Sequence, residues 1–596
     1  EMEMEMLKTI VTRPGLAMTL WLFGLLAPSA EAAVFRVGGD PACTHTDIQS
    51  AIDAAAANGG ETLDSIVIAR NLSYVAQALV IDSQRLLLRG GYADCSSTTR
   101  DLPMTVLDGA GNGNNPVLEI RSPGNTRQLV QIMGLELRGG HATTGDGGAL
   151  RIVGNAQLDL LGVYLHDNSA ISGGAIHARG NSLTGILDLS LGRDAATGEP
   201  FRAEGNTASL GGAVYIGAYA RLNAGSARIA GNHAISGGGI YFGPDGEGYF
   251  AFDPGVAPPG TYGIHSNTAE KDGGGIYIGS GLMHYVFRYS AVGSYRISSN
   301  EAGRDGGGIF VSGPGSYLFA YGLQLDGNRA GTLESGRGGG GYAGDGGTIL
   351  IRGDSGGDPV NYCLPDAPCA SVSGNRAGLN GHSGQGGGLF AGLGGHVTFL
   401  VGELRGNGSE QGSAGMAAGN NATLTLDSVL VSGNIGDGGT LLASSAATLD
   451  LQGITLTGEP GSGPLLGIAD ATLNVLDSII HQPARVAAAI AGASTISTDC
   501  VVSHENFHPG GDVRVFDPGF IDAAHGAYRL RPDSQALDAC SNSTSFNVDV
   551  RDNPRGVDLP EIPDIGGPYD AGAFETQVGD RLFADGFDTS APMPED

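Results

Sequence analysis

Residues 264–276 read Ile-His-Ser-Asn-Thr-Ala-Glu-Lys-Asp-Gly-Gly-Gly-Ile, which is an apolar-x-x-Asn element, a short polar step, and a glycine run that ends in an apolar residue. A unit that recurs in this way is typical of a solenoid, in which each repeat packs only against its neighbours. The unit returns with Asn168, Asn206, Asn232 and Asn300, and in weaker form around Asn328, Asn375, Asn407 and Asn434.

The segments between the glycine pairs have the length and pattern of β-strands. Leu158–Leu161 and Ile276–Ile278 are examples, and such runs are bounded by Gly, Asn and Asp. Three short strands and three turns per unit predict an all-β fold, a right-handed parallel β-helix from about residue 60 to about residue 515. The leucine spacing of leucine-rich repeats is absent, and Trp21 is the single tryptophan, which disfavours a WD-type propeller.

The repeated asparagines predict a ladder at one turn of the solenoid. Asparagine accommodates turn conformations, and stacked asparagine side chains can hydrogen-bond to one another along an axis. We therefore expect a structural row rather than a ligand site, formed by Asn168, Asn206, Asn232, Asn267 and Asn300.

The composition excludes some functions. The 596-residue chain contains 103 glycines and has a formal net charge of −30, with 32 Lys and Arg against 62 Asp and Glu. The sequence shows no basic stripe, so nucleic-acid binding, which requires phosphate neutralisation, is disfavoured.

The N-terminal residues have the pattern of an export signal. Lys8 and Arg13 precede an apolar run from Leu16 to Ala27, and Ala30-Glu-Ala32 supplies small residues for cleavage. No later stretch is apolar and long enough to span a membrane as a helix, so we expect no transmembrane span in the mature chain. Residues 46–56 predict one amphipathic helix, which would cap the first coil.

Six cysteines in an exported chain indicate disulfides. Proximity in the sequence favours Cys43–Cys95, Cys363–Cys369 and Cys500–Cys540, although six cysteines allow 15 pairings. Reduced, buried cysteines are the alternative.

The repeat units resemble those of chlamydial polymorphic outer-membrane proteins and of secreted bacterial β-helix proteins, over roughly residues 140–440. Near the C-terminus, Asp517-Pro-Gly-Phe520, Asn553-Pro-Arg555 and Asp570-Ala-Gly-Ala-Phe-Glu575 resemble the terminal segment of choice-of-anchor surface proteins. The resemblance implies a secreted or cell-surface protein of a Gram-negative bacterium. The expected division is a signal peptide (1–32), a cap with the first coils (33–110), β-helix repeats (111–515), a choice-of-anchor-like segment (516–577) and a tail (578–596).

Three motifs raise the question of chemistry. Recurrent Asp-Gly-Gly steps make Asp272 and Asp305 candidate Ca²⁺ ligands, although an Asx-type turn explains them as well. His504-Glu-Asn-Phe-His508 fits H-E-x-x-H, but Pro509-Gly-Gly511 would end the helix that a zinc site requires. Arg551–Arg555 superficially resembles a lyase arginine motif, and we expect a structural role for it.

We therefore predict a monomeric, non-enzymatic surface or secreted β-helix that functions in adhesion, envelope structure or matrix association, with a polysaccharide or cell-surface ligand and no catalytic residues. The alternatives are a polysaccharide lyase or glycoside hydrolase with a shallow groove, and a Ca²⁺-dependent surface scaffold. An enzyme should place at least three titratable residues together on one sheet face. The predicted contact loop is residues 243–262, with Tyr249, Phe250 and Phe252.

Overall fold

The computed structural model describes residues 32–577, apart from 60–61, 252–261, 280–286, 289–295, 354–369, 542–546, 560–561 and 563–564. The predicted signal peptide (except Ala32), the predicted tail, and the cysteines Cys363 and Cys369 lie outside these residues.

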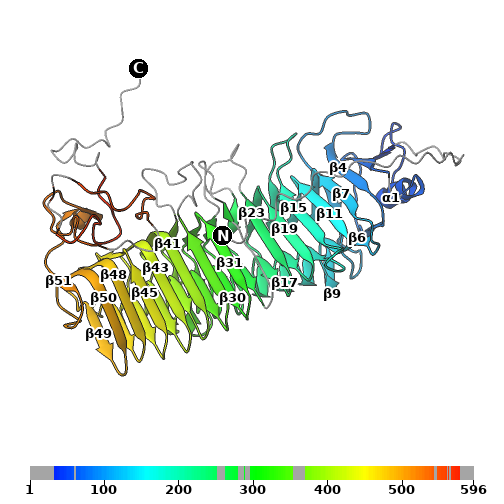
Figure 1. Ribbon diagram of the computed structural model, residues 1–596. Coiled ribbons are helices and arrows are strands. Elements are labelled where there is room, and N and C mark those ends of the chain that lie inside the picture. Colours follow the sequence, from blue (N-terminus) through cyan, green and yellow to red (C-terminus); the bar gives the residue numbers. More distant parts are fainter. Residues whose placement is uncertain are drawn as a thin grey trace, which may run out of the picture.

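The protein is an elongated parallel β-helix, as the repeat predicts (Figure 1). One helix, α1 (Ile48–Ala57), lies at the N-terminal end, and a separate segment lies against the last coils. Each typical coil passes through one strand of a 14-stranded sheet, two strands of a 27-stranded sheet, and the Asn turn. In the N-terminal and central coils, the chain then enters a short strand of an 8-stranded sheet.

The 14-stranded sheet is a single column of parallel strands. Its strands, in spatial order, are β3 (Leu79–Asp82), β6 (Leu118–Ser122), β10 (Leu150–Gly154), β14 (Ile176–Arg179), β18 (Val214–Ile216), β22 (Ile240–Phe242), β26 (Ile276–Ile278), β30 (Ile309–Ser312), β35 (Gly341–Gly344), β40 (Leu389–Ala391), β42 (Gly415–Ala418), β44 (Leu441–Ser444), β47 (Leu466–Ala469) and β49 (Ala488–Ala491).

The 27-stranded sheet contains two columns of parallel strands, and β41, β43, β48 and β50 run through both. The first column contains β1 (Val34–Val37), β2 (Asp64–Ala69), β4 (Leu86–Tyr92), β7 (Gln128–Met133), β11 (Ala156–Leu161), β15 (Leu187–Gly192), β19 (Ala220–Ala224), β23 (Glu247–Ala251), β27 (Phe287–Arg288), β31 (Tyr317–Tyr321), β36 (Thr348–Arg352), β41 (His396–Arg405), β43 (Thr423–Ser432), β45 (Thr448–Gln452), β48 (Thr472–Ile480) and β50 (Thr495–Ser503). The second column adds β5 (Thr105–Asp108), β8 (Leu135–Arg138), β12 (Tyr164–His166), β16 (Phe201–Glu204), β20 (Ala227–Ala230), β24 (Gly263–His265), β28 (Arg296–Ser298), β32 (Gln324–Asp326), β37 (Ser371–Ser373), β46 (Thr455–Thr457) and β51 (Val513–Val515).

The remaining strands are short. The 8-stranded sheet contains β9 (His141–Asp146), β13 (Ser169–Ser172), β17 (Thr207–Leu210), β21 (His233–Ser236), β25 (Thr268–Ala269), β29 (Glu301–Ala302), β33 (Arg329–Ala330) and β38 (Arg376–Ala377). Two pairs complete the set: β34 (Gly336–Arg337) with β39 (Gly384–Gln385), and the antiparallel β52 (Phe520–Asp522) with β53 (Ala527–Leu530) beside the 3₁₀ turn Ala523–His525.

In-register stacking builds the core. Ile240, Ile276 and Ile309 occupy equivalent positions on β22, β26 and β30, and all three are fully buried. The alternate residues point outward because successive side chains of a strand face opposite sides of the sheet. A single coil has too little apolar surface to bury its own residues, so each layer depends on the coils on either side of it.

The Asn ladder runs through buried side chains at one corner. Asn267 Oδ1 accepts hydrogen bonds from Asn232 N (3.0 Å) and Asn232 Nδ2 (2.9 Å), and Asn267 Nδ2 donates to Asn300 Oδ1 (3.0 Å). The same pattern extends from Asn168 through Asn206, Asn232, Asn267, Asn300, Asn328, Asn375 and Asn407 to Asn434. Glu459 ends the row, and its carboxyl accepts from Asn434 N (2.8 Å) and Asn434 Nδ2 (2.9 Å).

The left-handed residue of this turn is the one before each asparagine, rather than the asparagine itself. Ser266 and Ser299 have φ of 56° and 54°, and Gly231 has φ of 64°. The asparagine is therefore free to use its side chain for the ladder, while its neighbour makes the bend. Gly274 shows why glycine follows, because a Cβ there would lie 2.4 Å from Gly307 O in the next coil.

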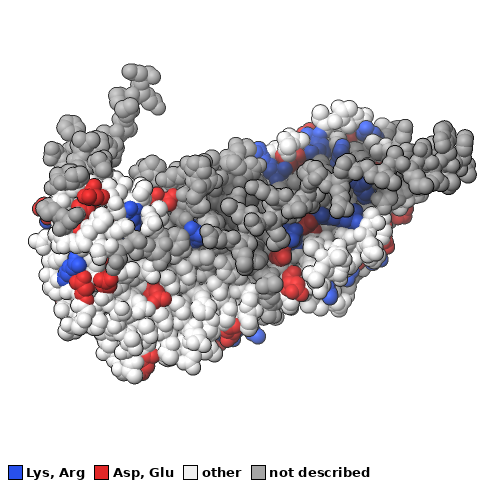
Figure 2. Space-filling view, viewed as in Figure 1, with Lys and Arg blue, Asp and Glu red and all other residues white. Residues whose placement is uncertain are grey.

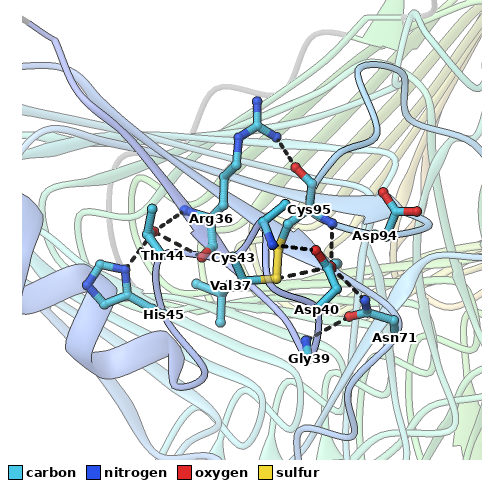
Figure 3. The surroundings of a disulfide bond; sticks show 12 residues. Arg36, Val37, Gly39, Asp40, Cys43, Thr44, His45, Asn71, Asp94 and Cys95 are labelled. Atoms are coloured by element: carbon cyan, nitrogen blue, oxygen red, sulfur yellow. Dashed lines mark hydrogen bonds between the residues drawn. A yellow bond between two sulfur atoms is a disulfide. The ribbon is translucent and has the colours of Figure 1, made fainter.

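The N-terminal end is closed by α1. Asp47 caps the helix by accepting from Ser50 N at 2.7 Å, and Ile48, Ala51 and Ile52 are buried in the first layer of the core. β1 already pairs in parallel with β2, so the solenoid begins before residue 60. The Cys43–Cys95 disulfide fastens this end, and Asp40 beside it accepts from Cys95 N and Asn71 Nδ2 (Figure 3).

The C-terminal segment packs on the second column near the last coils. Ala573 N donates to Thr455 Oγ1, and Ser428 Oγ donates to Val548 O. The Cys500–Cys540 disulfide joins the segment to β50. Two of the three predicted disulfides are thus confirmed.

Substitution in the middle of the ladder tests its contribution to stability. We expect Asn267→Ala to lower the free energy of unfolding by about 2 kcal/mol, because it leaves buried backbone and side-chain groups of two coils without partners. Asn420→Ala, at an exposed asparagine, should change it by less than about 0.5 kcal/mol. Equal effects of the two substitutions in urea denaturation would contradict the ladder.

Two buried acids predict that stability falls as the pH rises. Burial raises the pKa of Glu459 from its usual 4.5 to about 8 and the pKa of Asp477 from its usual 3.8 to about 7. The unfolded chain releases these protons at lower pH than the folded chain. The two protonated acids therefore contribute their full share to the free energy of unfolding below about pH 4, and this share is lost as the pH rises through 7 and 8.

Urea denaturation at a series of pH values should show that the free energy of unfolding falls as the pH rises. The fall should be less steep for Glu459→Gln. The control is Glu410→Gln, which removes the same charge at an exposed site. If both substitutions reduced the pH dependence of the free energy of unfolding equally, the effect would be due to net charge instead.

Candidate functional site

Outward-facing side chains of the second column form a dense polar surface over the N-terminal coils. These polar side chains form two rows that cross the strands in register. Between the two rows lie the buried residues Leu137, Leu165 and Ala203. We call this surface the charged face, and it consists of Asp108, Glu136, Arg138, Tyr164, His166, Arg202, Glu204 and Arg228.

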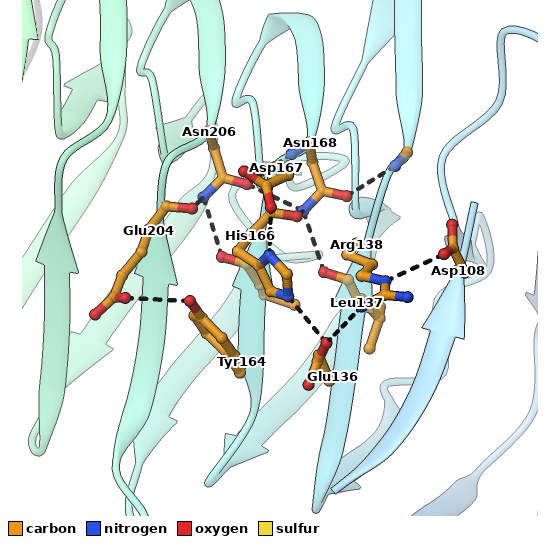
Figure 4. Close-up of polar contacts among 12 residues, drawn as sticks. Asp108, Glu136, Leu137, Arg138, Tyr164, His166, Asp167, Asn168, Glu204 and Asn206 are labelled. Carbon is orange, nitrogen blue, oxygen red and sulfur yellow. Dashed lines mark hydrogen bonds and ion pairs between the residues drawn. The ribbon is translucent and has the colours of Figure 1, made fainter. Parts of the chain in front are cut away.

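Polar contacts join each coil of the charged face to the next, and Figure 4 shows those from Asp108 to Glu204. Arg138 Nε lies 3.1 Å from Asp108 Oδ2, and His166 Nε2 lies 3.0 Å from Glu136 Oε1. Arg228 Nε lies 2.6 Å from Glu204 Oε1. These pairs cross strand boundaries, so they fix the side chains relative to one another in addition to any small gain in stability.

Aromatic contacts lie in the middle of the charged face. The rings of Tyr164 and His166 stack with centroids 4.3 Å apart, and the Arg202 guanidinium lies 4.3 Å from the Tyr164 ring centroid. The Tyr164 hydroxyl donates to Glu204 Oε2 at 3.2 Å. Burial, reinforced by Glu204, raises the pKa of Tyr164, so the phenol remains a proton donor.

A hollow of about 350 Å³ adjoins this surface on its N-terminal side. Its wall includes Arg70, Tyr74 and Met104 together with Asp108, Glu136 and Arg138. The hollow therefore extends the charged face into a concave, partly apolar site with convergent polar groups, the usual form of a ligand site. On the face seen in Figure 2, basic side chains gather over these N-terminal coils.

The charged face contains more than three titratable residues, the grouping expected of an enzyme. Each of its three carboxylates contacts a cationic or hydrogen-bond-donating partner on a neighbouring strand. Glycoside hydrolysis needs a pair of carboxyl groups, one of which acts as an acid. On the charged face, each carboxylate is instead engaged with a side chain of a neighbouring strand.

The predicted contact loop is partly a strand. Residues 247–251 form β23 of the first column, and Phe250 is 1 % exposed in the core, so its prediction as a ligand contact is wrong. The alternation of a strand places Phe250 inward and Tyr249 outward, where Arg221 lies 5.6 Å from its ring. Phe252 falls within 252–261, one of the gaps in the described chain.

The candidate calcium ligands are ion-pair partners of arginine. Arg304 Nε and Nη2 donate to the two carboxylate oxygens of Asp272 at 2.8 and 2.5 Å. Arg337 makes the same fork with Asp305, at 3.1 and 2.6 Å. Both aspartates are nearly buried, and their oxygen atoms, which would have to bind Ca²⁺, are occupied by guanidinium groups.

The two other motifs have structural positions. His504 and His508 lie in a loop after β50, where His504 contacts Arg485 O and His508 contacts Thr498 Oγ1, so they do not share a helix face. Arg555 donates to Gly572 O and Asp570 O inside the C-terminal segment. The H-E-x-x-H match is thus a loop sequence, and Arg555 is a buried structural residue.

The sequence interpretation missed the charged face and a row of stacked rings on the 14-stranded sheet. Neighbouring rings lie 4.6–5.5 Å apart. The sequence did carry a signal for this row. In most central coils, the residue that follows the Gly-Gly-x-apolar unit is aromatic. The row consists of His177, Tyr215, Tyr241, Tyr277, Phe310, Tyr342 and Phe390.

Comparison with protein-family models and with curated proteins finds no match for this chain. Among the described residues, no helix has the length and apolar character needed to cross a membrane.

The arginine forks predict that Ca²⁺ does not stabilise the protein selectively. At matched ionic strength, Ca²⁺, Mg²⁺ and Na⁺ should give the same melting temperature, and chelation should not lower it. Arg304→Gln should destabilise by about 1–3 kcal/mol, because it leaves the buried Asp272 carboxylate without its main partner. Selective stabilisation of the wild type by Ca²⁺, lost in Asp272→Asn, would contradict this interpretation.

Proposed function

We propose that the protein is an exported, non-enzymatic surface or secreted β-helix that binds polysaccharide through the charged face. The observation that carries the proposal is the Tyr164–His166–Arg202 stack, held among cross-coil ion pairs beside a hollow of about 350 Å³.

The chemistry of the charged face suits a sugar polymer. Tyr164 and His166 offer apolar ring surface with polar edges, while arginine and glutamate offer planar groups for hydroxyls. Because neighbouring strands lie about 4.8 Å apart, a ligand that lies along the solenoid meets a new set of side chains at every coil. Cross-strand pairing holds these groups in place before binding, which lowers the entropic cost of association.

The resemblance of the repeats to polymorphic outer-membrane proteins, and of residues 516–577 to choice-of-anchor segments, supports a location at the cell surface or outside the cell. The charged-then-apolar N-terminus, residues 1–32, supports export with cleavage near Ala32. The two disulfides fit an oxidising compartment.

A second candidate function is polysaccharide lyase activity. The observation that favours it is the grouping of Tyr164, His166 and Arg202, because elimination needs a proton acceptor, a proton donor and a cation near the sugar acid. The hydroxyl contact of Tyr164 with Glu204 places a donor and an acceptor together.

Binding to a polysaccharide panel tests the proposed function. We expect the secreted chain to bind at least one polymer, and Tyr164→Ala or Arg202→Ala to weaken that binding about tenfold or more, through lost ring and cation contacts. The matched controls are Tyr321→Ala and Arg352→Ala, a cross-strand Tyr–Arg pair at 5.4 Å on a distant coil.

Three results would count against the proposal: no binding to any polymer, equal losses in both variant pairs, or a mature mass that retains residues 1–32. Unsaturated products in the same panel, abolished by His166→Ala, would replace binding by the lyase function.

A further inference from the structure

The C-terminal end of the 14-stranded sheet is an open strand edge. β49 pairs with β47 through Leu466↔Ala488 to Ala469↔Ala491, and it is the last strand in the order of that sheet. No strand of the described chain pairs with its other edge. Ile490 is in register with the buried Ile468, yet it is 41 % exposed. The apolar column of the core therefore ends at a residue that no further coil covers.

The loop that follows β50 covers only part of this end. Phe507 packs against the core, and Glu505 accepts a hydrogen bond from Ala487 N just before β49 begins. β51 continues only the second column, through Val501↔Val513. Ala488 is half-buried, and Ala489, Ile490 and Ala491 are exposed.

The open edge lacks the features that normally protect one. Residues 486–498 read Val-Ala-Ala-Ala-Ile-Ala-Gly-Ala-Ser-Thr-Ile-Ser-Thr, with no charged residue and no proline. Natural edge strands usually carry a lysine, a proline or a bulge, because unpaired backbone groups on an apolar strand recruit another strand. Figure 2 shows a mostly uncharged surface over these last coils.

The two ends of the solenoid differ, and this difference indicates which partner can pair with the open edge of β49. α1 packs against β1, β2 and β3 and buries Ile48 and Ile52, so the N-terminal end presents a helix rather than a strand edge (Figure 1). Head-to-tail stacking of copies would need open edges at both ends. Contact between two C-terminal ends needs only one open edge on each copy. A twofold axis makes this edge complementary to itself.

In place of the monomer that the sequence predicts, we propose that a second copy of this chain docks on this open strand edge, with β49 of each copy pairing antiparallel to β49 of the other. Main-chain hydrogen bonds of the two strands and burial of the two Ile490 side chains hold the pair. Association stops at two copies because α1 closes both outer ends. Each copy has a formal net charge of −30, so added salt strengthens the dimer by screening repulsion.

Light scattering coupled to size exclusion, over a series of protein and salt concentrations, tests the dimer on the mature full chain. We expect a concentration-dependent dimer that tightens with NaCl. Ile490→Lys and Ala491→Lys should each raise the dissociation constant about tenfold or more, because they place like charges across the twofold axis. Ile435→Lys, at a residue 51 % exposed on another coil, is the matched control. Thermal melts of each variant check that the solenoid is folded.

The alternative partner of the open edge is the segment 578–596 of the same chain. A shortened chain that ends at Gln577 distinguishes this alternative from the dimer. A dimer in both chains that the two edge variants dissociate supports the proposal. A monomer in both chains, a dimer that survives both edge variants, or a dimer formed only after removal of residues 578–596 overturns it.

Discussion

In-register stacking of coils is the constraint on which the rest of this molecule depends. Ile240, Ile276 and Ile309 are each buried only because an equivalent residue lies above and below them. The same register brings asparagine over asparagine at the corner, so that each amide satisfies groups of the adjacent coil. Since an unpaired buried amide is costly, a coil that slipped by one residue would lose both the core and the ladder.

Register also organises the charges of an acidic chain. Opposite charges meet across coils at Arg138–Asp108, Arg228–Glu204 and Arg304–Asp272. The first two pairs are partly exposed and add little stability, whereas the third holds the buried Asp272, and every pair orients two side chains. On the charged face, this orientation holds Tyr164, His166 and Arg202 together in the surface that we propose binds polysaccharide. At Asp272 and Asp305, arginine fills the carboxylate positions that a calcium ion would need.

The ends of the solenoid follow from the same constraint, because an interior coil is always covered and a terminal coil is not. α1 and the Cys43–Cys95 disulfide close the first coil. At the other end, the C-terminal segment packs on the second column beside the buried Glu459 and Asp477, while β49 keeps an open edge. One end is thus closed by a helix, and the other is partly available to a partner.

The amino-acid sequence alone was enough to predict the repeat, and with it the parallel β-helix, the corner asparagines, the capping helix and two local disulfides. These features depend on residue types that recur at fixed intervals or lie near each other in the chain, so spacing alone reveals them. Asn168 to Asn300 and the helix at 48–57 are the clearest cases.

Which outward-facing residues meet depends on the register of the folded coils, and this register could not be predicted from the sequence. Tyr164 and Arg202 lie 38 positions apart in numbering, and neither belongs to the repeated motif, so their contact depends on how coils of unequal length come into register. The same cause turned Phe250 from a predicted contact into a core residue, because one strand position decides between inside and outside. It also gave Asp272 an arginine partner, since Arg304 occupies the adjoining position one coil later.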